Sequence, residues 1–288
     1  MKQMKTCWLL YDAPDLSVNR DFAAMMREYG LRYGLDVEAV TLDRLTLGMD
    51  GSGQPYALLD GQPARPDAVL ARMRLDLVSE HLERMGIPVF NNSRVCRICN
   101  DKRRTHLFLQ GLPMADTVFL TDACQQPGAL PRVLKPADGH GGEAVQLIET
   151  EAQWLAASEA LHKGGLRPAL HQAVAGKPGC DLRVYVLFGQ ILAGVMRTAK
   201  EGVVSNFKLG GHVALHTLTD AERALAQAVI DRFEAAGAPL CMAGVDLLYD
   251  EAGPLISEVE DVVGSRMLYK VSDIDLADLY LQGIAERL

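Results

Sequence analysis

The stretch Gly244-Val-Asp-Leu-Leu-Tyr-Asp-Glu-Ala-Gly-Pro-Leu-Ile-Ser-Glu-Val-Glu260 decides how the last third of this chain folds. Two largely apolar segments flank Asp250–Pro254, whose composition is typical of a turn, so the stretch predicts a β-hairpin. Folding it symmetrically about residue 252 pairs Asp246 with Glu258, and the period of two places Glu260 on the same face. Three carboxylates are therefore expected on one face of the hairpin.

These three carboxylates predict a metal site. Like charges directly opposite each other destabilise a sheet, and buried carboxylates need compensation. A divalent cation supplies it, and oxygen ligands suit Mg²⁺, which usually also holds substrate phosphates. Mn²⁺ is a second hard cation that such ligands accept. The alternative is a solvated hairpin face with ordinary acidic residues, and the hairpin alone does not decide between the two.

A glycine-rich turn is the second feature, in Val133-Leu-Lys135-Pro-Ala-Asp-Gly139-His140-Gly141-Gly142. Glycines let backbone N–H groups approach an anion closely, and a lysine on the preceding strand adds a point charge. The pattern therefore indicates a phosphate site, although it is not the Walker motif. An ordinary glycine-rich hairpin turn is the alternative.

A third feature is the segment Asp181-Leu-Arg183-Val-Tyr185. The period of two puts Asp181, Arg183 and Tyr185 on one face of a strand. Arg197 ends the next expected strand and comes near Arg183 if a short hairpin connects the two. Two arginines on one face can clamp a phosphate or acyl phosphate. Taken alone, the segment is more typical of an exposed polar face.

The rest of the chain predicts a mixed α/β fold. Strands and helices alternate in the first ninety residues, which indicates a small open parallel sheet. A hairpin or loop is expected at 48–66, in the middle of this region. The expected strands are 6–11, 37–42, 67–72, 87–90, 133–135, 144–148, 169–174, 182–188, 191–197, 243–249 and 255–260. The expected helices are 19–33, 75–85, 101–110, 151–162, 220–236 and a last one from 276.

Composition excludes some classes of protein. The chain has 288 residues and a net charge of −8, and this acidic balance argues against nucleic acid as a partner. No apolar run approaches the roughly 20 residues of a membrane helix. Met1–Trp8 runs directly into Leu-Leu-Tyr-Asp, which predicts the strand at 6–11 rather than a signal peptide. A cytoplasmic protein is expected. Cys96 and Cys99 form a CxxC without a second pair, so two thiols on a helix are expected rather than a zinc site.

Taken in order, these pieces resemble the ATP-grasp superfamily and, within it, the RimK-like α-L-glutamate ligases, over nearly the whole chain. The motifs that carry the resemblance are Asn91 to Lys102, Lys135, Gly139 to Gly142, Gly179-Cys-Asp-Leu-Arg183, Ala199-Lys-Glu-Gly202, Ser205-Asn206, Gly210-Gly211, Gly244-Val-Asp246 and Glu258-Val-Glu260. The resemblance implies an N-terminal open parallel-sheet (pre-ATP-grasp) domain at 1–95. It also implies a small lid domain at 96–174 and a C-terminal antiparallel-sheet domain with the metal site at 175–288.

The resemblance also implies a role for each site residue. ATP is expected to contact Lys102, Lys135, Gly139, His140, Gly141, Gly142, Gln172, Val174 and Asp181. Mg²⁺ is expected on Asp246, Glu258 and Glu260, and the acylphosphate beside Arg183, Arg197 and Asn206. The candidate substrate contacts are Arg72, Ser205 and Arg266.

This chain departs from the family pattern at three places near the substrates. Gln172 replaces a glutamate, Val204 replaces an arginine, and Glu260 replaces the last metal asparagine, with Gly264-Ser-Arg266 following in place of the usual Pro-Gly. The transferred amino acid is therefore left open.

The expected function is an ATP-dependent carboxylate–amine ligase. It forms an amide through an acylphosphate from small-molecule or peptide substrates and releases ADP and phosphate. A small-molecule kinase and a non-catalytic nucleotide- or carboxylate-binding protein on the same fold are the alternatives. The sequence leaves open whether the chain forms a homo-oligomer.

Overall fold

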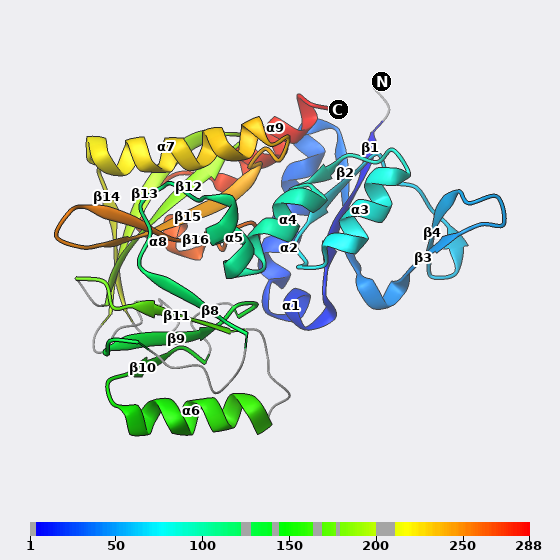
Figure 1. Ribbon diagram of the computed structural model, residues 1–288. Helices are drawn as coiled ribbons and strands as arrows, with labels where there is room; N and C mark the ends of the chain where they lie inside the picture. The colour runs from blue at the N-terminus through cyan, green and yellow to red at the C-terminus, as the bar shows by residue number, and fades with distance from the viewer. Residues whose placement is uncertain (1–3, 122–127, 140–143, 164–168, 177–178, 200–210) are drawn as a thin grey trace.

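The computed structural model describes residues 4–121, 128–139, 144–163, 169–176, 179–199 and 211–288. Within them the strands form one parallel and three antiparallel sheets, which helices cover and connect (Figure 1). This is the mixed α/β architecture that the sequence predicted. No helix in these ranges is both long enough and apolar enough to cross a membrane.

The N-terminal domain is built on the parallel sheet, whose strand order is β2-β1-β6-β7. Its elements are β1 (Lys5–Tyr11), α1 (Ala13–Val18), α2 (Arg20–Gly30), β2 (Leu35–Thr41), β6 (Ala68–Ala71), α3 (Asp76–Arg84) and β7 (Val89–Phe90). The last five residues of β1 are all buried, as expected for a central strand that is covered on both faces. The expected hairpin or loop is the small sheet of β3 (Leu45–Met49), β4 (Pro55–Leu59) and β5 (Gln62–Pro63), which projects from the domain (Figure 1).

A second antiparallel sheet, with the order β10-β9-β11-β8, forms the lid domain. Its strands are β8 (Thr117–Leu120), β9 (Arg132–Pro136), β10 (Gln146–Ile148) and β11 (Ala169–Ala173), and α6 (Glu151–Lys163) covers one face. Trp154 and Ala157 of α6 pack on that face with Leu134 and Ile148. β8 was not expected from the sequence.

The third antiparallel sheet, β14-β13-β12-β15-β16, forms the C-terminal domain. Its elements are β12 (Cys180–Leu187), β13 (Gln190–Thr198), β14 (His212–His216), α7 (Asp220–Ala235), β15 (Met242–Tyr249) and β16 (Pro254–Glu260). Leu182, Val184 and Val186 pack in the core that contains α7, whereas Tyr185 and Leu187 join the core of the N-terminal domain. The alternation expected along β12 is therefore confirmed, and both faces of the sheet are covered.

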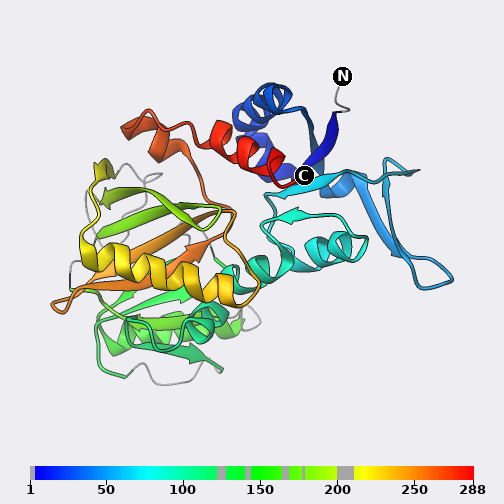
Figure 2. The same ribbon diagram turned by 90° about the horizontal axis from the view of Figure 1, so that it is seen from above.

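Two segments pack against elements that are distant from them in the sequence. The helices α4 (Ser93–Cys99) and α5 (Lys102–Phe108) precede the lid sheet, yet Val95, Ile98 and Leu109 are buried in the core under α7. These residues therefore pack with the C-terminal sheet and not in the core of the β10-β9-β11-β8 sheet. At the other end of the chain, α8 (Arg266–Val271) and α9 (Leu276–Ala285) return to the N-terminal domain, where α9 packs beside α2 (Figure 2).

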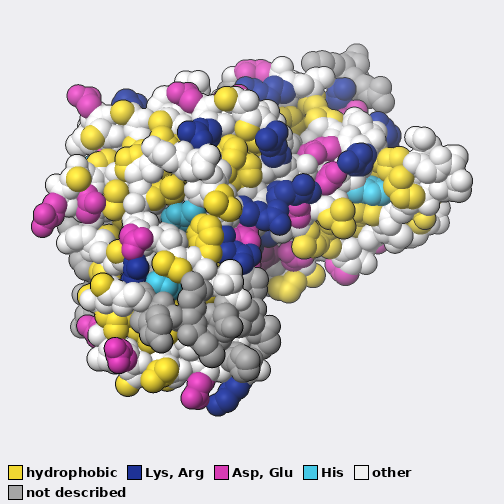
Figure 3. All heavy atoms as spheres, in the orientation of Figure 1, with side chains coloured by type: hydrophobic (Ala, Val, Ile, Leu, Met, Phe, Trp, Pro, Cys, Tyr) yellow, Lys and Arg dark blue, Asp and Glu magenta, His cyan; other side chains and the backbone are white. Residues whose placement is uncertain are grey.

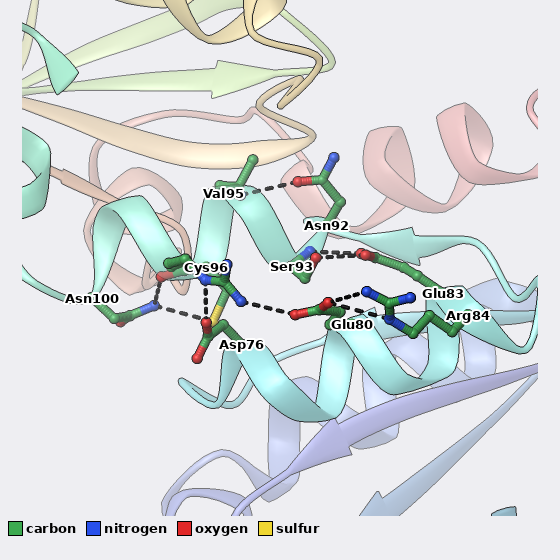
Figure 4. Close-up of polar contacts among 10 residues, drawn as sticks. Asp76, Glu80, Glu83, Arg84, Asn92, Ser93, Val95, Cys96 and Asn100 are labelled. Carbon is green, nitrogen blue, oxygen red and sulfur yellow. Dashed lines mark hydrogen bonds and ion pairs between the residues drawn. The ribbon is translucent and has the colours of Figure 1, made fainter. Parts of the chain in front are cut away.

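Polar contacts fasten α4 to α3 of the N-terminal domain (Figure 4). Arg97 donates to Asp76 at 2.5 Å and to Glu80 at 2.8 Å. The carboxylate of Glu83 accepts from the backbone N–H of Ser93 at 2.6 Å. The helix that leads into Lys102 is therefore held between the two domains.

Candidate active site

A pocket lies where α5, the end of β9 and the last residues of β16 meet. It is lined by Arg74, Cys99, Asn100, Lys102, Ala137, Asp138, Gly139, Glu258, Val259, Glu260, Asp261 and Val262. Figure 3 shows Lys and Arg side chains gathered near the middle of one face, over α4, with acidic side chains beside them. The pocket thus brings together parts of the chain that lie more than 150 residues apart.

Lys102 joins the glycine-rich turn to the hairpin. It is the first residue of α5, after the N-cap Asp101, whose side chain accepts from the N–H of Arg103. Its Nζ lies 3.2 Å from an oxygen of Glu258 and also donates to the carbonyl of Gly139. The structure therefore places the first expected phosphate lysine against both the turn and an expected metal ligand.

Lys135 lies on β9 beside the same carboxylate and is buried. Burial, helped by the charge of Lys102 and opposed by that of Glu258, lowers the pKa of its amine to about 8. Burial alone would raise the pKa of Glu258, but the charges of Lys102 and Lys135 hold it below its ordinary value. A second anion entering beside the lysines would raise the pKa of Lys135 again.

The register predicted for the hairpin is confirmed at its acidic residues. Asp246 pairs with Glu258 and Gly244 with Glu260. The symmetric fold drawn about residue 252 is wrong nearer the turn, where Leu247 pairs with Ile256. A β-bulge at Ser257 adds one residue to β16, so the two halves of the hairpin have different registers.

The polar face of β12 is buried rather than exposed, which corrects the interpretation that the segment alone favoured. Arg183 donates to both oxygens of Asp246, at 2.7 and 2.6 Å, and lies 2.9 Å from Glu260. Side-chain exposure is 6% for Arg183 and 3% for Asp246. A Cβ on Gly244 would approach Arg183 Cδ to 3.2 Å and Val263 to 2.9 Å, so a glycine leaves room for the guanidinium.

Arg197 completes this network from the next strand. The two-residue turn of Phe188 and Gly189, both at positive φ, is the short hairpin that the sequence predicted, and it pairs Arg197 with Asp181. Its guanidinium donates to Asp181 and, at 2.7 Å, to Asp246. Burial would raise the pKa of Asp246, but Arg183 and Arg197 hold it well below its usual range. Asp246 is therefore ionised at all ordinary pH values.

The donor set fits a metal ion only in part. In the described ranges, no group of three His, Cys, Asp or Glu side chains is arranged to hold a metal ion. Glu258 and Glu260 line the pocket and offer oxygen ligands to a hard cation such as Mg²⁺. The oxygens of Asp246 instead face the two arginines, so these cations compensate it where a metal was expected to do so.

The expected base-recognition segment lies at the end of β11. The side-chain amide of Gln172 donates to Thr117 Oγ1 at 2.8 Å and lies 3.1 Å from His106 Nε2. Burial lowers the pKa of His106 to about 4, so the ring is neutral and Nε2 accepts from the amide. Both hydrogens of the Gln172 amide are then used, and its oxygen remains to accept from a ligand. Val174 follows β11 and is half-buried.

Other expected site residues lie elsewhere. His140, Gly141, Gly142, Ser205 and Asn206 are outside the described residues. Arg266 is exposed at the start of α8 and donates to the carbonyl of Val18 at 2.5 Å, away from the pocket lining. Arg72 is buried and donates to the carbonyl of Val263 at 2.9 Å.

Two polar residues of the site were missed from the sequence. His106 lies one helical turn after Lys102 on α5, a spacing that places it on the same face. Asp261 follows β16 and accepts from Asn100, and burial raises its pKa to about 6. Its position directly after Glu260 was the one available signal.

Residues 115–284 match the model of the RimK-like ATP-grasp domain. The chain belongs to the RimK-like ATP-grasp family. It is 30% identical over 243 residues to a probable alpha-L-glutamate ligase of Xanthomonas oryzae pv. oryzae, covering 81% of this chain and 80% of the relative. A protein of the same name from Parasynechococcus marenigrum is 28% identical over 97% of this chain, which spans only 62% of that relative.

Solved structures share the fold of this RimK-like chain. D-cycloserine synthetase superposes with a TM-score of 0.73 at 20% identity, over 98% of this chain and 99% of the other. D-alanyl-alanine synthetase A of Vibrio cholerae gives 0.71 at 17% identity, over 99% of both chains. These likenesses confirm the ATP-grasp fold expected from the motifs.

Proposed function

We propose that this protein is an ATP-dependent carboxylate–amine ligase that releases ADP and phosphate. The observation that carries the proposal is the pocket in which Lys102 and Glu258 are 3.2 Å apart, with Lys135 buried beside them. Two amines at one carboxylate form a site whose charges suit a metal–triphosphate complex. The family match supports the same chemistry, and the glutamate ligases among the relatives make an amino acid a reasonable first substrate to test.

The reaction has two steps. An oxygen of the substrate carboxylate attacks the γ-phosphorus of ATP, the bond to the β-phosphate oxygen breaks, and ADP leaves with an acylphosphate formed. The amine nitrogen of the second substrate then attacks the acyl carbon, phosphate leaves with the bonding electron pair, and the nitrogen loses a proton to solvent. Mg²⁺, or Mn²⁺ in its place, neutralises phosphate charge when it is bound.

The residues of this chain position and neutralise the reactants. Lys102 and Lys135 stabilise the charge of the phosphates, and Glu258 and Glu260 would hold the metal. Arg183 and Arg197 orient Asp246 and balance its charge. The family motif assigns Asn206 to the acylphosphate. Gln172 presents its carbonyl oxygen to the amino group of adenine.

A screen for ADP release tests the proposal. Purified protein, ATP and Mg²⁺ are combined with amino acids, short peptides and carboxylic acids, alone and in pairs. We expect ADP and phosphate in equal amounts, only in the presence of an acid. Hydroxylamine should replace the amine and yield a hydroxamate from the acylphosphate. AMP as the stoichiometric product would overturn the proposal.

The screen also separates the two alternatives. A kinase gives ADP and a stable phosphorylated product, with neither amide nor hydroxamate. A binding protein gives nucleotide binding without turnover for every pair of substrates. Glu258→Gln is the matched negative control for a ligase, because it keeps the size of the side chain and removes its charge.

A further inference from the structure

Two polar side chains lie at the carboxyl edge of the N-terminal sheet, outside the pocket lining. Tyr11 ends β1, and Arg72 follows directly after β6. The two strands are parallel, with Cys7 beside Ala68 and Leu9 beside Leu70, so Tyr11 and Arg72 are neighbours on one face. The strand order β2-β1-β6-β7 reverses direction between β1 and β6, and ligands of open α/β sheets bind at the carboxyl ends of such a strand pair.

The donors of these side chains lack partners. Arg72 is 6% exposed and Tyr11 is 1% exposed. Arg72 Nη2 donates to the carbonyl of Val263, but Arg72 Nε, Arg72 Nη1 and the Tyr11 hydroxyl make no hydrogen bond within the described part of the chain. Buried polar atoms almost always have a partner, and a buried guanidinium needs one most. Three orphaned donors on two residues that are neighbours by register indicate a site for an anion.

The position of this pair connects it to the active site. Val263, which accepts from Arg72, lies three residues after Glu260, and the next residue, Gly264, accepts from the hydroxyl of Tyr185 at 2.8 Å. Between Glu260 and Val263, Asp261 and Val262 line the pocket itself. The loop after β16 therefore has the pocket on one side and the Tyr11–Arg72 pair on the other.

We propose that Tyr11 and Arg72 form a subsite for a substrate carboxylate that is not the one activated by ATP. The guanidinium supplies the charge and up to three N–H donors, and the phenol adds an O–H donor at its edge. The inference rests on the proposed ligase function and narrows its substrates to those that bring a second carboxylate, as an amino acid does when it serves as the amine.

The α1–α2 segment covers the subsite. The ring of Phe22 lies 5.4 Å from the guanidinium carbon of Arg72, and Arg266 holds the same segment by donating to the carbonyl of Val18. A carboxylate can enter only if this segment moves. Arg266 then stabilises the closed position of the segment and does not contact the substrate itself.

The test compares Tyr11→Phe with Tyr280→Phe. Both residues are buried in the same core, but the Tyr280 hydroxyl donates to the carbonyl of Phe90 whereas that of Tyr11 is unpaired. Losing an unpaired hydroxyl should leave the melting temperature unchanged or higher, and losing a paired one should lower it. For the carboxylate-bearing amine, Tyr11→Phe should raise KM about tenfold with kcat within about twofold, and Tyr280→Phe should leave KM unchanged.

Arg72→Met supplies the charge test. The two substrates compared are an amine that carries a carboxylate and the same amine with a primary carboxamide in place of that carboxylate. Wild type should prefer the first by about 100-fold or more in kcat/KM, and Arg72→Met should reduce this preference to about threefold or less. Calorimetry with succinate and succinamide, at saturating non-hydrolysable ATP analogue and Mg²⁺, gives a readout independent of turnover. Succinate should bind wild type, and it should bind Tyr11→Phe and Arg72→Met at least about tenfold more weakly.

The outcomes separate the two proposals. No ADP with any substrate pair counts against the ligase, and calorimetry then still decides on the subsite. Equal affinity for succinate and succinamide in wild type overturns the subsite even if the ligase turns over. Unchanged succinate affinity in Tyr11→Phe and Arg72→Met overturns it as well.

Discussion

Replacing Lys135 by methionine is expected to stabilise the fold and to remove the activity. Burial is the main reason that the pKa of this amine falls from 10.5 to about 8. Such a change corresponds to about 3 kcal/mol of unfavourable free energy whenever the folded protein carries the charged amine. Methionine keeps the length of the side chain without the charge, so below pH 8 the variant should gain up to about 3 kcal/mol in free energy of unfolding.

The sign of the pH dependence follows from the lowered pKa of Lys135. Between about pH 8 and pH 10.5 the unfolded chain binds more protons at this residue than the folded protein does. The stability of wild type relative to the variant therefore rises with pH over that window. The advantage of Lys135→Met is complete below pH 8 and should vanish above about pH 10.5, where the amine is neutral in both states.

Urea denaturation of both proteins with EDTA, at pH 7 and above pH 10, measures this difference. Lys163→Met is the matched control, because Lys163 also lies in the lid domain but its side chain is 78% exposed. It should change stability by less than about 0.5 kcal/mol at either pH. Turnover of Lys135→Met should fall about 100-fold or more, since a lost contact to developing charge costs on the order of 3 kcal/mol. A less stable variant, or a gain that is equal at both pH values, would refute the reasoning.

Three further substitutions test other parts of the site. Asp246→Asn leaves the buried guanidinium of Arg183 without its carboxylate and should lower the free energy of unfolding by about 3 kcal/mol or more, as urea denaturation will show. Because the pKa of Asp246 is lowered, its contribution is present above the unfolded pKa of about 3.8 and is lost only as pH falls through the lower folded value. Glu260→Gln should raise the Mg²⁺ concentration for half-maximal activity about tenfold, and an identical Mg²⁺ titration would remove Glu260 from the metal site. Gln172→Glu replaces a donor with an acceptor, so the pKa of His106 should rise above about 4 in an NMR titration; an unchanged value would contradict the hydrogen bond.

The features that the sequence predicted correctly depend on local periodicity. The alternation along β12 separates Leu182 and Val184 from Tyr185, and the structure keeps this separation because both faces meet a core. The pairing of Asp246 with Glu258 followed from a turn and a period of two. Such patterns need only neighbouring residues, so a single sequence contains them.

The features that were missed depend on distant residues. The period of two shows that Arg183 and Asp181 share a face but not what covers that face, so an exposed strand was favoured where Asp246 and Arg197 in fact enclose it. Ser257 is not a residue type that marks a bulge in a sequence, and the bulge there follows from how β16 pairs with β15. Ile98 and Leu109 lie in the range expected as the lid because the chain enters the lid sheet next, yet their apolar side chains are buried under α7.

The side chains at and beneath the pocket, here called its floor, carry both charges. Their carboxylates led us to expect a metal, and the arginines compensate Asp246 in place of that metal. The four cationic side chains named there are matched by four carboxylates: Lys102, Lys135, Arg183 and Arg197 against Asp181, Asp246, Glu258 and Glu260. These eight side chains carry no net charge between them, and Arg74 against Asp138 and Asp261 leaves the pocket no excess of positive charge for a triphosphate. A divalent cation on the two glutamates would make that floor positive, and the triphosphate in turn would supply the remaining oxygen ligands. Each ligand must then raise the affinity for the other by the same factor. Nucleotide and metal are accordingly expected to enter together.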